Sequence, residues 1–120
     1  MPQTRNNAAE NTAVVIRTGA TRLKAVKVEQ RTFDAPQLYL QLFNTASITP
    51  GTTAPVAVVP IPAGKAERQM MDSKIICTGA EGGIVFPTAL GYCVTTTHDG
   101  ATDPDAGDEP VVIIDWEALG

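Results

Sequence analysis

The chain has 120 residues, which is enough for one domain to bury a core without metals or disulfides. Hydrophobic residues make up 43% and charged residues 18%, so most of the chain should fold rather than stay disordered. The formal net charge is −4 and the nine basic residues are spread along the chain, whereas nucleic-acid binding needs them clustered against phosphates. We therefore expect no nucleic-acid partner and no membrane partner.

Residues 1–12, MPQTRNNAAENT, are polar, rich in asparagine and without hydrophobic periodicity. They lack the apolar core of a secretory signal, so we expect synthesis in a cytosol, where thiols stay reduced. Cys77 and Cys93 are then expected to be buried, free and unreactive. Alone, the 1–12 segment should be disordered, because its composition opposes self-burial. We assign it as an extended N-terminal arm, held by a neighbouring subunit or by the domain's own surface, and residues 13–120 as one domain.

The first part of that domain has the pattern of β-strands. Residues 12–18, TAVVIRT, are short and rich in β-branched side chains. Residues 21–32, TRLKAVKVEQRT, alternate, but the apolar positions change phase between Ala25 and Val26. A phase change of this kind predicts a bulge or bend within a long strand.

The next strand is expected at residues 37–44, QLYLQLFN, where leucines occupy every second position. The opposite face holds Tyr39, Gln41 and Phe43, so we expect it to be covered as well, for example by a partner. A loop marked by Pro50-Gly51 follows, and then the apolar run 55–64, PVAVVPIPAG. The prolines inside this run cannot donate to a sheet ladder, so the strand should lie at an edge or end early.

The remaining elements complete an all-β pattern. Residues 65–74, KAERQMMDSK, have the best helix propensity but no amphipathic stripe, so a strand or a single turn competes with a helix. Further strands are expected at KIICT, GGIVF, ALGYCVTTT and EPVVIIDW. Several short strands with regular turn signals and little helix predict a single β-sandwich, jelly-roll-like or immunoglobulin-like.

The stretch 90–115 holds the residues with the most chemical potential, including Cys93 and the single histidine, His98. The chain has only two serines, and neither lies in a G-x-S-x-G motif. Five residues of extended chain would hold Cys93 too far from His98 for a proton transfer, unless the chain folds back or Cys77 is the nucleophile. We therefore expect no enzymatic activity and no catalytic residue, with His98 exposed on a loop.

The same stretch offers few metal ligands of the right kind. Two isolated cysteines and one histidine do not supply the four ligands of a structural zinc site. The acidic run DGATDPDAGDE could suit calcium, but its glycines lie at the wrong offsets for an EF-hand. A solvated turn competes and is favoured, because Asp, Gly and Pro form turns without metal. We assign no metal and no cofactor, and expect the acidic side chains to be solvated and dispensable for folding: Asp99, Asp103, Asp105, Asp108 and Glu109.

Three segments follow one another in an order that points to a family. LYLQLFNTASITPGTTAPVAVVPIPAG is followed by GGIVFPTALGYCVTTTHDGATDP and by a final VVIIDW. This order resembles a group of small virion structural proteins of tailed phages, over roughly residues 33–117. The motifs that carry it are turn and strand-edge residues: Leu40 to Asn44, Gly51 to Pro55, Ile61 to Gly64, Gly83 to Gly91, Thr95 to Thr97 and Val111 to Trp116. The N-terminal region and both cysteines depart from the pattern.

The resemblance implies a β-sandwich protein of the phage particle, made in the host cytoplasm and without catalytic activity. We expect a capsid decoration or head accessory protein that is homo-oligomeric and binds the major capsid protein or another virion protein. A head-fibre, collar or tail component is the alternative, and a carbohydrate-binding module is a third hypothesis. We expect attachment through apolar β-surfaces and the arm, with these candidate interface residues: Tyr39, Phe43, Trp116, Arg5, Asn6 and Asn7. For the three aromatic residues, filling the core is an equally good interpretation.

Overall fold

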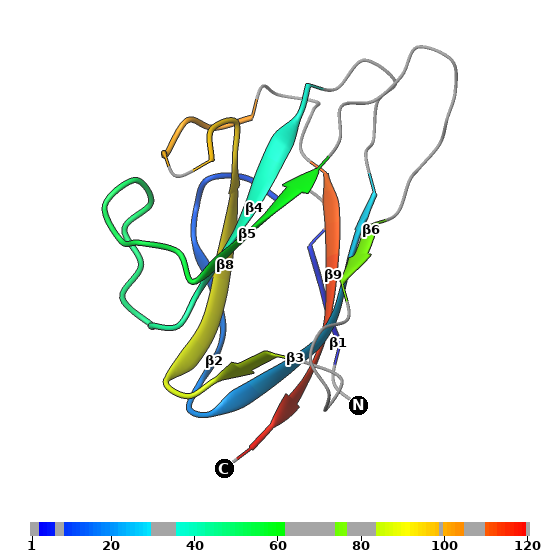
Figure 1. Cartoon of the computed structure of the whole chain (residues 1–120), viewed down its shortest axis with the longest axis vertical. Helices are drawn as coiled ribbons and strands as arrows, with labels where there is room; N and C mark the ends of the chain where they lie inside the picture. The colour runs from blue at the N-terminus through cyan, green and yellow to red at the C-terminus, as the bar shows by residue number, and fades with distance from the viewer. Residues whose placement is uncertain are drawn as a thin grey trace.

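The computed structural model describes residues 3–6, 9–29, 36–61, 74–76, 84–98, 100–104 and 110–119. Within these ranges all regular secondary structure is β-strand, and the strands form two antiparallel sheets packed face to face (Figure 1). The predicted β-sandwich is therefore confirmed. The helix, turn or strand considered for residues 65–74 lies outside the described residues, apart from Lys74.

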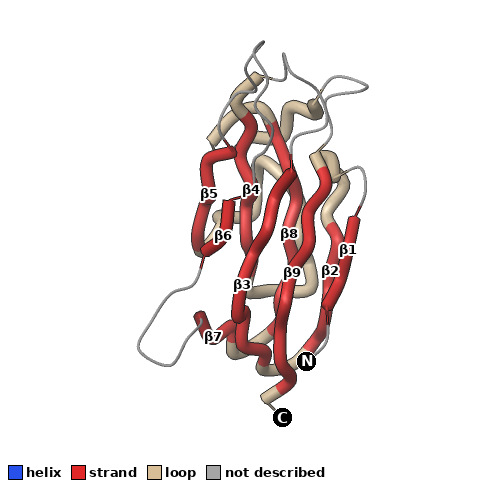
Figure 2. Tube along the Cα trace, turned by 90° about the vertical axis from the view of Figure 1, so that its right-hand side faces the viewer, coloured by secondary structure: helices blue, strands red, loops and turns tan. Residues whose placement is uncertain are grey.

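The first sheet, sheet A, has the order β1-β9-β3-β6, and β7 also pairs with β3. Its strands are β1 (Gln3–Asn6), β9 (Val111–Ala118), β3 (Thr21–Glu29), β6 (Lys74–Ile76) and β7 (Ile84–Phe86). β7 pairs with the first residues of β3 and β6 with the later ones, so these two short strands share one edge of β3. Sheet A is thus four strands wide, and Figure 2 looks onto its outer face.

The second sheet, sheet B, has the order β2-β8-β4-β5. Its strands are β2 (Val14–Thr18), β8 (Ala89–Thr95), β4 (Leu38–Phe43) and β5 (Ala57–Ile61). β5 is an edge strand, as its prolines predicted. The chain passes from β2 in sheet B to β3 in sheet A at Gly19, whose φ of 116° favours glycine. The Gly19 N–H donates to the Thr88 carbonyl at 2.7 Å, which fixes this corner against the start of β8.

The core between the sheets is aliphatic, because the chain has few aromatic residues. Leu38, Leu40 and Leu42 of β4 face sheet A and are at most 1% exposed, which confirms the predicted alternation. They belong to one cluster with Val112 and Ile114 of β9. Burying each such side chain stabilises the fold by about 1.5–3 kcal/mol.

The predicted bulge in β3 is present. The register between β3 and β9 shifts between Leu23 and Ala25. Because of this shift, Leu23, Val26 and Val28 are all buried in the core, although they do not share one alternating phase. The bulge therefore reconciles an irregular apolar pattern with one continuous strand.

The outer face of sheet B is covered too, and the cover is the chain's own. Every residue of β8 is buried, as are Gln41 and Phe43 on the outward side of β4. Two loops supply the cover, residues 44–56 between β4 and β5 and the described part of the β8–β9 connection, residues 96–98 and 100–104 (Figure 1). The predicted cover is confirmed, but no partner is needed to provide it.

Ile48 of the first loop lies directly over Gly91, where any side chain would collide with it. The two covering loops also contact each other: a Cβ added to Gly51 would meet the Ala101 Cβ at 3.1 Å, and Gly51 has a φ of 85°. A side chain at position 51 would be strained by the left-handed backbone, and one at position 91 would force the Ile48 side chain to shift.

Of the two means of holding the N-terminal arm that the sequence left open, the structure shows the domain's own surface. Gln3–Asn6 form strand β1, which pairs with β9 along its whole length (Figure 2). Ala9 is fully buried, and its N–H donates to the Pro110 carbonyl at 2.9 Å. Composition failed as a guide because a strand can be held by backbone hydrogen bonds to a neighbour, which need no apolar side chains.

Side chains strengthen the attachment of β1. Gln3 Nε2 donates to Asp115 at 2.7 Å, and Asn6 Nδ2 donates to the Tyr92 hydroxyl at 3.0 Å. On the same strand, Thr4 Oγ1 accepts a hydrogen bond of 3.1 Å from the Trp116 indole. The domain's own surface therefore holds this segment.

We expect Gly91→Ala to destabilise the protein by about 1–3 kcal/mol, because the new methyl group overpacks the outer side of sheet B. It would overlap the Ile48 side chain and lie 3.1 Å from the Val14 carbonyl oxygen. Urea unfolding measures the change. In an Ile48→Ala background the additional loss should shrink, because most of the overlap has been removed. Equal losses in the two backgrounds would contradict the packing described.

Deletion of residues 1–6 is expected to lower the free energy of unfolding by several kcal/mol. The deletion removes the β1–β9 ladder and the side-chain bonds, each of which contributes about 0.5–1.5 kcal/mol. Unfolding can be followed by the fluorescence of Trp116, the single tryptophan. Thr4→Val, which removes only the bond from that indole, is the graded control, with a loss of about 1 kcal/mol. A truncated protein of unchanged stability would show that β1 is not part of the fold.

Candidate interaction surfaces

The three predicted interface aromatics do not form one surface. Phe43 is 0% exposed beneath the covering loops of sheet B, so its side chain cannot reach a partner, and the alternative that it fills the interior is confirmed. Trp116 is half-buried on β9 of sheet A and packs against the core. Tyr39 is half-buried on β4 of sheet B. Tyr39 and Trp116 therefore lie on different sheets, and their role as interface residues stays a prediction.

The predicted polar interface residues of the N-terminal segment are also separated. Arg5 is exposed on the outer side of sheet A, whereas Asn6 bonds the Tyr92 hydroxyl at the sandwich edge. Burial raises the pKa of the Tyr92 phenol, and the hydrogen bond from Asn6 opposes that shift. Asn7 lies outside the described residues.

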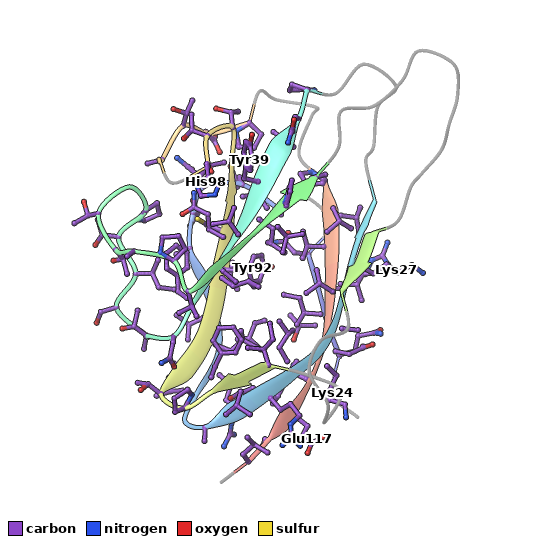
Figure 3. The ribbon with its side chains drawn as sticks, viewed as in Figure 1. Lys24, Lys27, Tyr39, Tyr92, His98 and Glu117 are labelled. Carbon is purple, nitrogen blue, oxygen red and sulfur yellow. The ribbon has the colours of Figure 1, made fainter. Side chains whose placement is uncertain are left out.

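Tyr39 lies next to His98 near one end of the sandwich, and Figure 3 labels both. Their ring centroids are 5.8 Å apart with an interplanar angle of 70°, an edge-to-face contact. His98 is exposed on the loop after β8, as predicted. Because Cys93 is buried inside the sheet and His98 points to solvent, the structure does not place them as a nucleophile and base.

A buried polar cluster fixes the loop that carries His98. Gln41 Nε2 donates to the Thr95 hydroxyl at 2.8 Å and to the Gly100 carbonyl at 3.1 Å. The Thr95 hydroxyl in turn donates to the Thr97 carbonyl at 2.6 Å. Gln41 is fully buried, and its Oε1 has no hydrogen-bond partner. The cluster ties β4 to the loop after β8 at the cost of that one unpaired oxygen.

Of the acidic run, only Asp103 belongs to the part of the chain that the structure describes. Asp103 is exposed, and its carboxylate accepts the Asn11 backbone N–H at 3.0 Å. The Asn11 side chain donates to the Ala101 carbonyl at 2.8 Å, so the loop is joined to the N-terminal segment. Asp103 therefore has a structural contact in addition to its exposure. Across the described ranges, no group of three or more metal-ligating side chains comes together.

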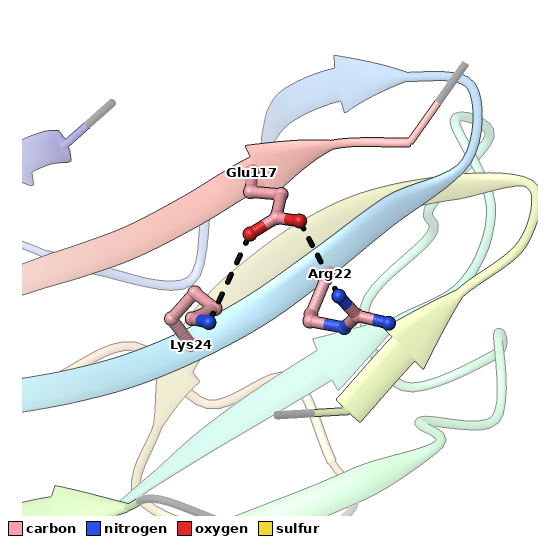
Figure 4. Close-up of polar contacts among 3 residues, drawn as sticks. All are labelled: Arg22, Lys24 and Glu117. Carbon is pink, nitrogen blue, oxygen red and sulfur yellow. Dashed lines mark hydrogen bonds and ion pairs between the residues drawn. The ribbon is translucent and has the colours of Figure 1, made fainter. Parts of the chain in front are cut away.

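The outer face of sheet A carries an ionic cluster (Figure 4). Glu117 of β9 bonds Arg22 at 3.3 Å and approaches the Lys24 ammonium at 3.8 Å, both from β3. These side chains are 23–37% exposed, so the pairs are partly screened by water and each contributes less than about 1 kcal/mol. Their effect is to fix the position of charge on the face rather than to hold the sheets together.

Further charges lie along the same face. In the register of β1, β9 and β3, Arg5 and Lys27 flank Ile113 from opposite sides. Lys27 is exposed, and Figure 3 shows it directed away from the sandwich. We call the charged side chains of this surface the basic face: Arg5, Arg22, Lys24, Lys27, Asp115 and Glu117. Among the charged side chains that the structure describes on this face, four are basic and two acidic, whereas the formal net charge of the whole chain is −4. The side chains of Glu29 on β3 and Lys74 on β6 lie outside that described set.

Sequence reasoning missed the basic face. The signal was present in the alternation of β3, TRLKAVKVE, where basic residues occupy the positions between apolar ones. Without the pairing of β3 with β9 and of β9 with β1, nothing in the sequence places Arg5 beside Lys27. Composition alone had suggested that basic residues were dispersed.

Cys93 is buried and free, as predicted, whereas Cys77 lies outside the described residues. Burial raises the pKa of the Cys93 thiol to about 11, so the reactive thiolate is disfavoured near neutral pH. The thiol is a poor nucleophile and fills space on the outward side of sheet B.

In comparisons with known proteins, no family model, curated protein or solved structure matched the chain. In the described part of the chain there is no helix long and apolar enough to cross a membrane.

We expect the Cys93 thiol to resist labelling by a disulfide reagent at about pH 8 until the protein unfolds. A Cys77→Ser background isolates its signal, and adding Ser47→Cys, at an exposed loop position, provides a thiol that should react at once. The folded pKa of about 11 exceeds the reference value of 9.0, so the contribution of the Cys93 thiol to the stability of the folded protein is complete below pH 9 and declines as the pH rises toward 11. Equal labelling rates for the buried and exposed thiols would contradict the burial described.

Proposed function

We propose that this protein is a structural component of a tailed-phage particle, a capsid decoration or head accessory protein that attaches through its basic face. The partner is an acidic surface on the major capsid protein or another virion protein. The role requires binding and no catalysis.

One observation carries the choice of surface: the two broad faces of the sandwich differ in kind. On the outer side of sheet B the chain's own loops cover β8 and part of β4, and Phe43, Gly91 and Cys93 lie beneath them. On the outer side of sheet A no described loop crosses β3 and β9 (Figure 2), and these strands carry most of the basic face, including the ionic cluster of Figure 4. A face with excess positive charge is suited to an acidic partner, because complementary potentials speed encounter and fix orientation.

The resemblance to virion proteins is a second, sequence-based argument for a structural role in a phage particle. Its motifs fall on sheet B and its β4–β5 loop, and also on β7 and β9 of sheet A. β1, β2 and β3 lie outside the resemblance, and two of them help to build the basic face. We infer that the resembling motifs specify the scaffold and that the N-terminal strands adapt it to one partner.

A carbohydrate-binding module is less well supported, because such sites use exposed aromatic rings as platforms. Tyr92 is 1% exposed, and Trp116 and Tyr39 are each half-buried in different sheets. Among the described residues, the exposed large hydrophobic side chains are aliphatic: Val15, Val56, Val85 and Leu119.

Co-sedimentation with phage particles that lack the protein tests the proposal. Arg5→Gln/Lys27→Gln should weaken binding by about tenfold, because two positive contacts are lost. Ser47→Glu/Thr52→Glu, on an exposed loop of sheet B, changes the net charge equally and should bind like the wild type. Binding should also weaken as salt rises, since exposed charges are screened.

Equal binding by the two double variants would contradict the basic face as the attachment site. Binding confined to tail fractions would favour a tail or collar position, and a glycan-array signal without particle binding would favour a carbohydrate-binding module.

A further inference from the structure

The edge strands in the described part of the chain differ in what would stop a further strand from pairing with them. β1 has four residues and carries Arg5, β2 has a register shift next to Arg17, and β6 and β7 have three residues each. Short, charged or irregular edges discourage pairing. β5, Ala57–Ile61, has five residues, a regular register with β4 and no charged side chain, so none of these protections applies to it.

The hydrogen bonds of sheet B determine which way the backbone groups of β4 point. The Val94 N–H donates to the Glu10 carbonyl at 2.9 Å, on the side of β8 that carries β2. Because backbone groups alternate along an antiparallel strand, Cys93 turns its own groups toward β4, where its register partner is Gln41. Leu42, the next residue of β4, therefore turns its groups toward β5.

The same alternation fixes the direction of the β5 backbone. The Leu42 carbonyl accepts the Val56 N–H at 2.7 Å, which agrees with a Leu42 that faces β5. Ala57, the register partner of Leu42, therefore faces β4. Val58 and Pro60 have the opposite phase, so their backbone groups point to the outer edge of the sheet.

Pro60 thus lies on the outer edge of β5 and not in the inner ladder. A proline has no N–H, and its ring occupies the place from which a donor would bond. A further strand would meet the outward N–H of Val58 and, two residues on, a position that cannot donate. Because residue 60 turns away from β4, the proline removes this outer donor without removing a bond inside sheet B.

The composition of β5 gives this proline a purpose. The strand reads AVVPI, so apart from Pro60 it is uncharged, apolar and mostly β-branched. A segment of this kind at an open edge is prone to pair with other chains, and a proline at a position outside the ladder interrupts it. Pro60 is exposed to solvent, where it can act in this way.

We propose that Pro60 closes the outer edge of β5, so that neither a second copy of this chain nor an extended segment of another protein adds a strand to sheet B there. Partners then contact the faces of the sandwich and not this edge. The inference does not rest on the proposed function, because it concerns only the backbone of β5.

Hydrogen exchange of the wild type, followed residue by residue by NMR, tests the assigned phase. The Val59 N–H has the same phase as Ala57 and belongs to the inner ladder, so its exchange requires local opening. The Val58 N–H points outward and should exchange faster, by at least on the order of tenfold. Equal protection of the two amides, or a protected Val58 beside an unprotected Val59, would overturn the proposal.

Restoring a donor at position 60 tests the role of the proline. Pro60→Thr supplies the missing N–H without adding apolar surface. Its weight-average mass by light scattering should rise to about twice that of the wild type at the same concentration, because two antiparallel edges close as a dimer. Pro87→Thr, which replaces an exposed proline between β7 and β8, should keep the wild-type mass.

A second substitution locates the new contact. Val58→Lys/Pro60→Thr should return to the wild-type mass, because a lysine on an edge strand discourages pairing. Pro60→Ala restores the same donor with a smaller side chain and keeps the test decisive if Pro60→Thr does not fold. Folded donor-restored variants that keep the wild-type mass at every concentration would overturn the proposal, as would association that persists in Val58→Lys/Pro60→Thr.

Discussion

The structure depends on the burial of β8 and β4 from both sides. Sheet A covers the inner face of these strands, and the loops of residues 44–56, 96–98 and 100–104 cover the outer face, so every residue of β8 is buried. A strand buried on both faces must be apolar or have its polar groups satisfied. This explains both the small residues Gly91 and Cys93 on its outer side and the hydrogen bonds that bind Gln41 to Thr95 and Gly100.

Because of this constraint, the two outer faces of the sandwich tolerate substitution differently. Because the loops of sheet B are needed to seal the interior, they are poor places for a binding surface that must vary. The outer face of sheet A does not cover the core, so its charged side chains can be substituted without exposing the core. We therefore place the proposed partner recognition on the basic face.

The sequence predicted the features that depend on local alternation. The leucines of β4, the bulge in β3 and the edge position of β5 all followed from the spacing of apolar residues and prolines. Phe43 and Tyr39 share one face of β4, but their different burial could not be predicted. Only the packing of distant loops decides which of the two side chains is covered. β1 was misjudged because its attachment is through backbone hydrogen bonds to β9, which composition does not reveal. The basic face was missed for the same reason, since it exists only in the register of three strands.

The pairing of β1 with β9 also bears on how the chain is made. β1 lies at residues 3–6 and its partner at residues 111–118, so β1 has no partner until that later segment has been made. Among the strand pairs of the described residues only β4 and β5 are neighbours in the chain, and contacts between distant segments slow folding to the millisecond-to-second range. Sheet A therefore closes only after β9 has been made, and until then the apolar residues of β3 have no partner strand from β9. Newly made chains pass through a stage in which both sheets are incomplete, which makes crowded synthesis the step most prone to misassembly.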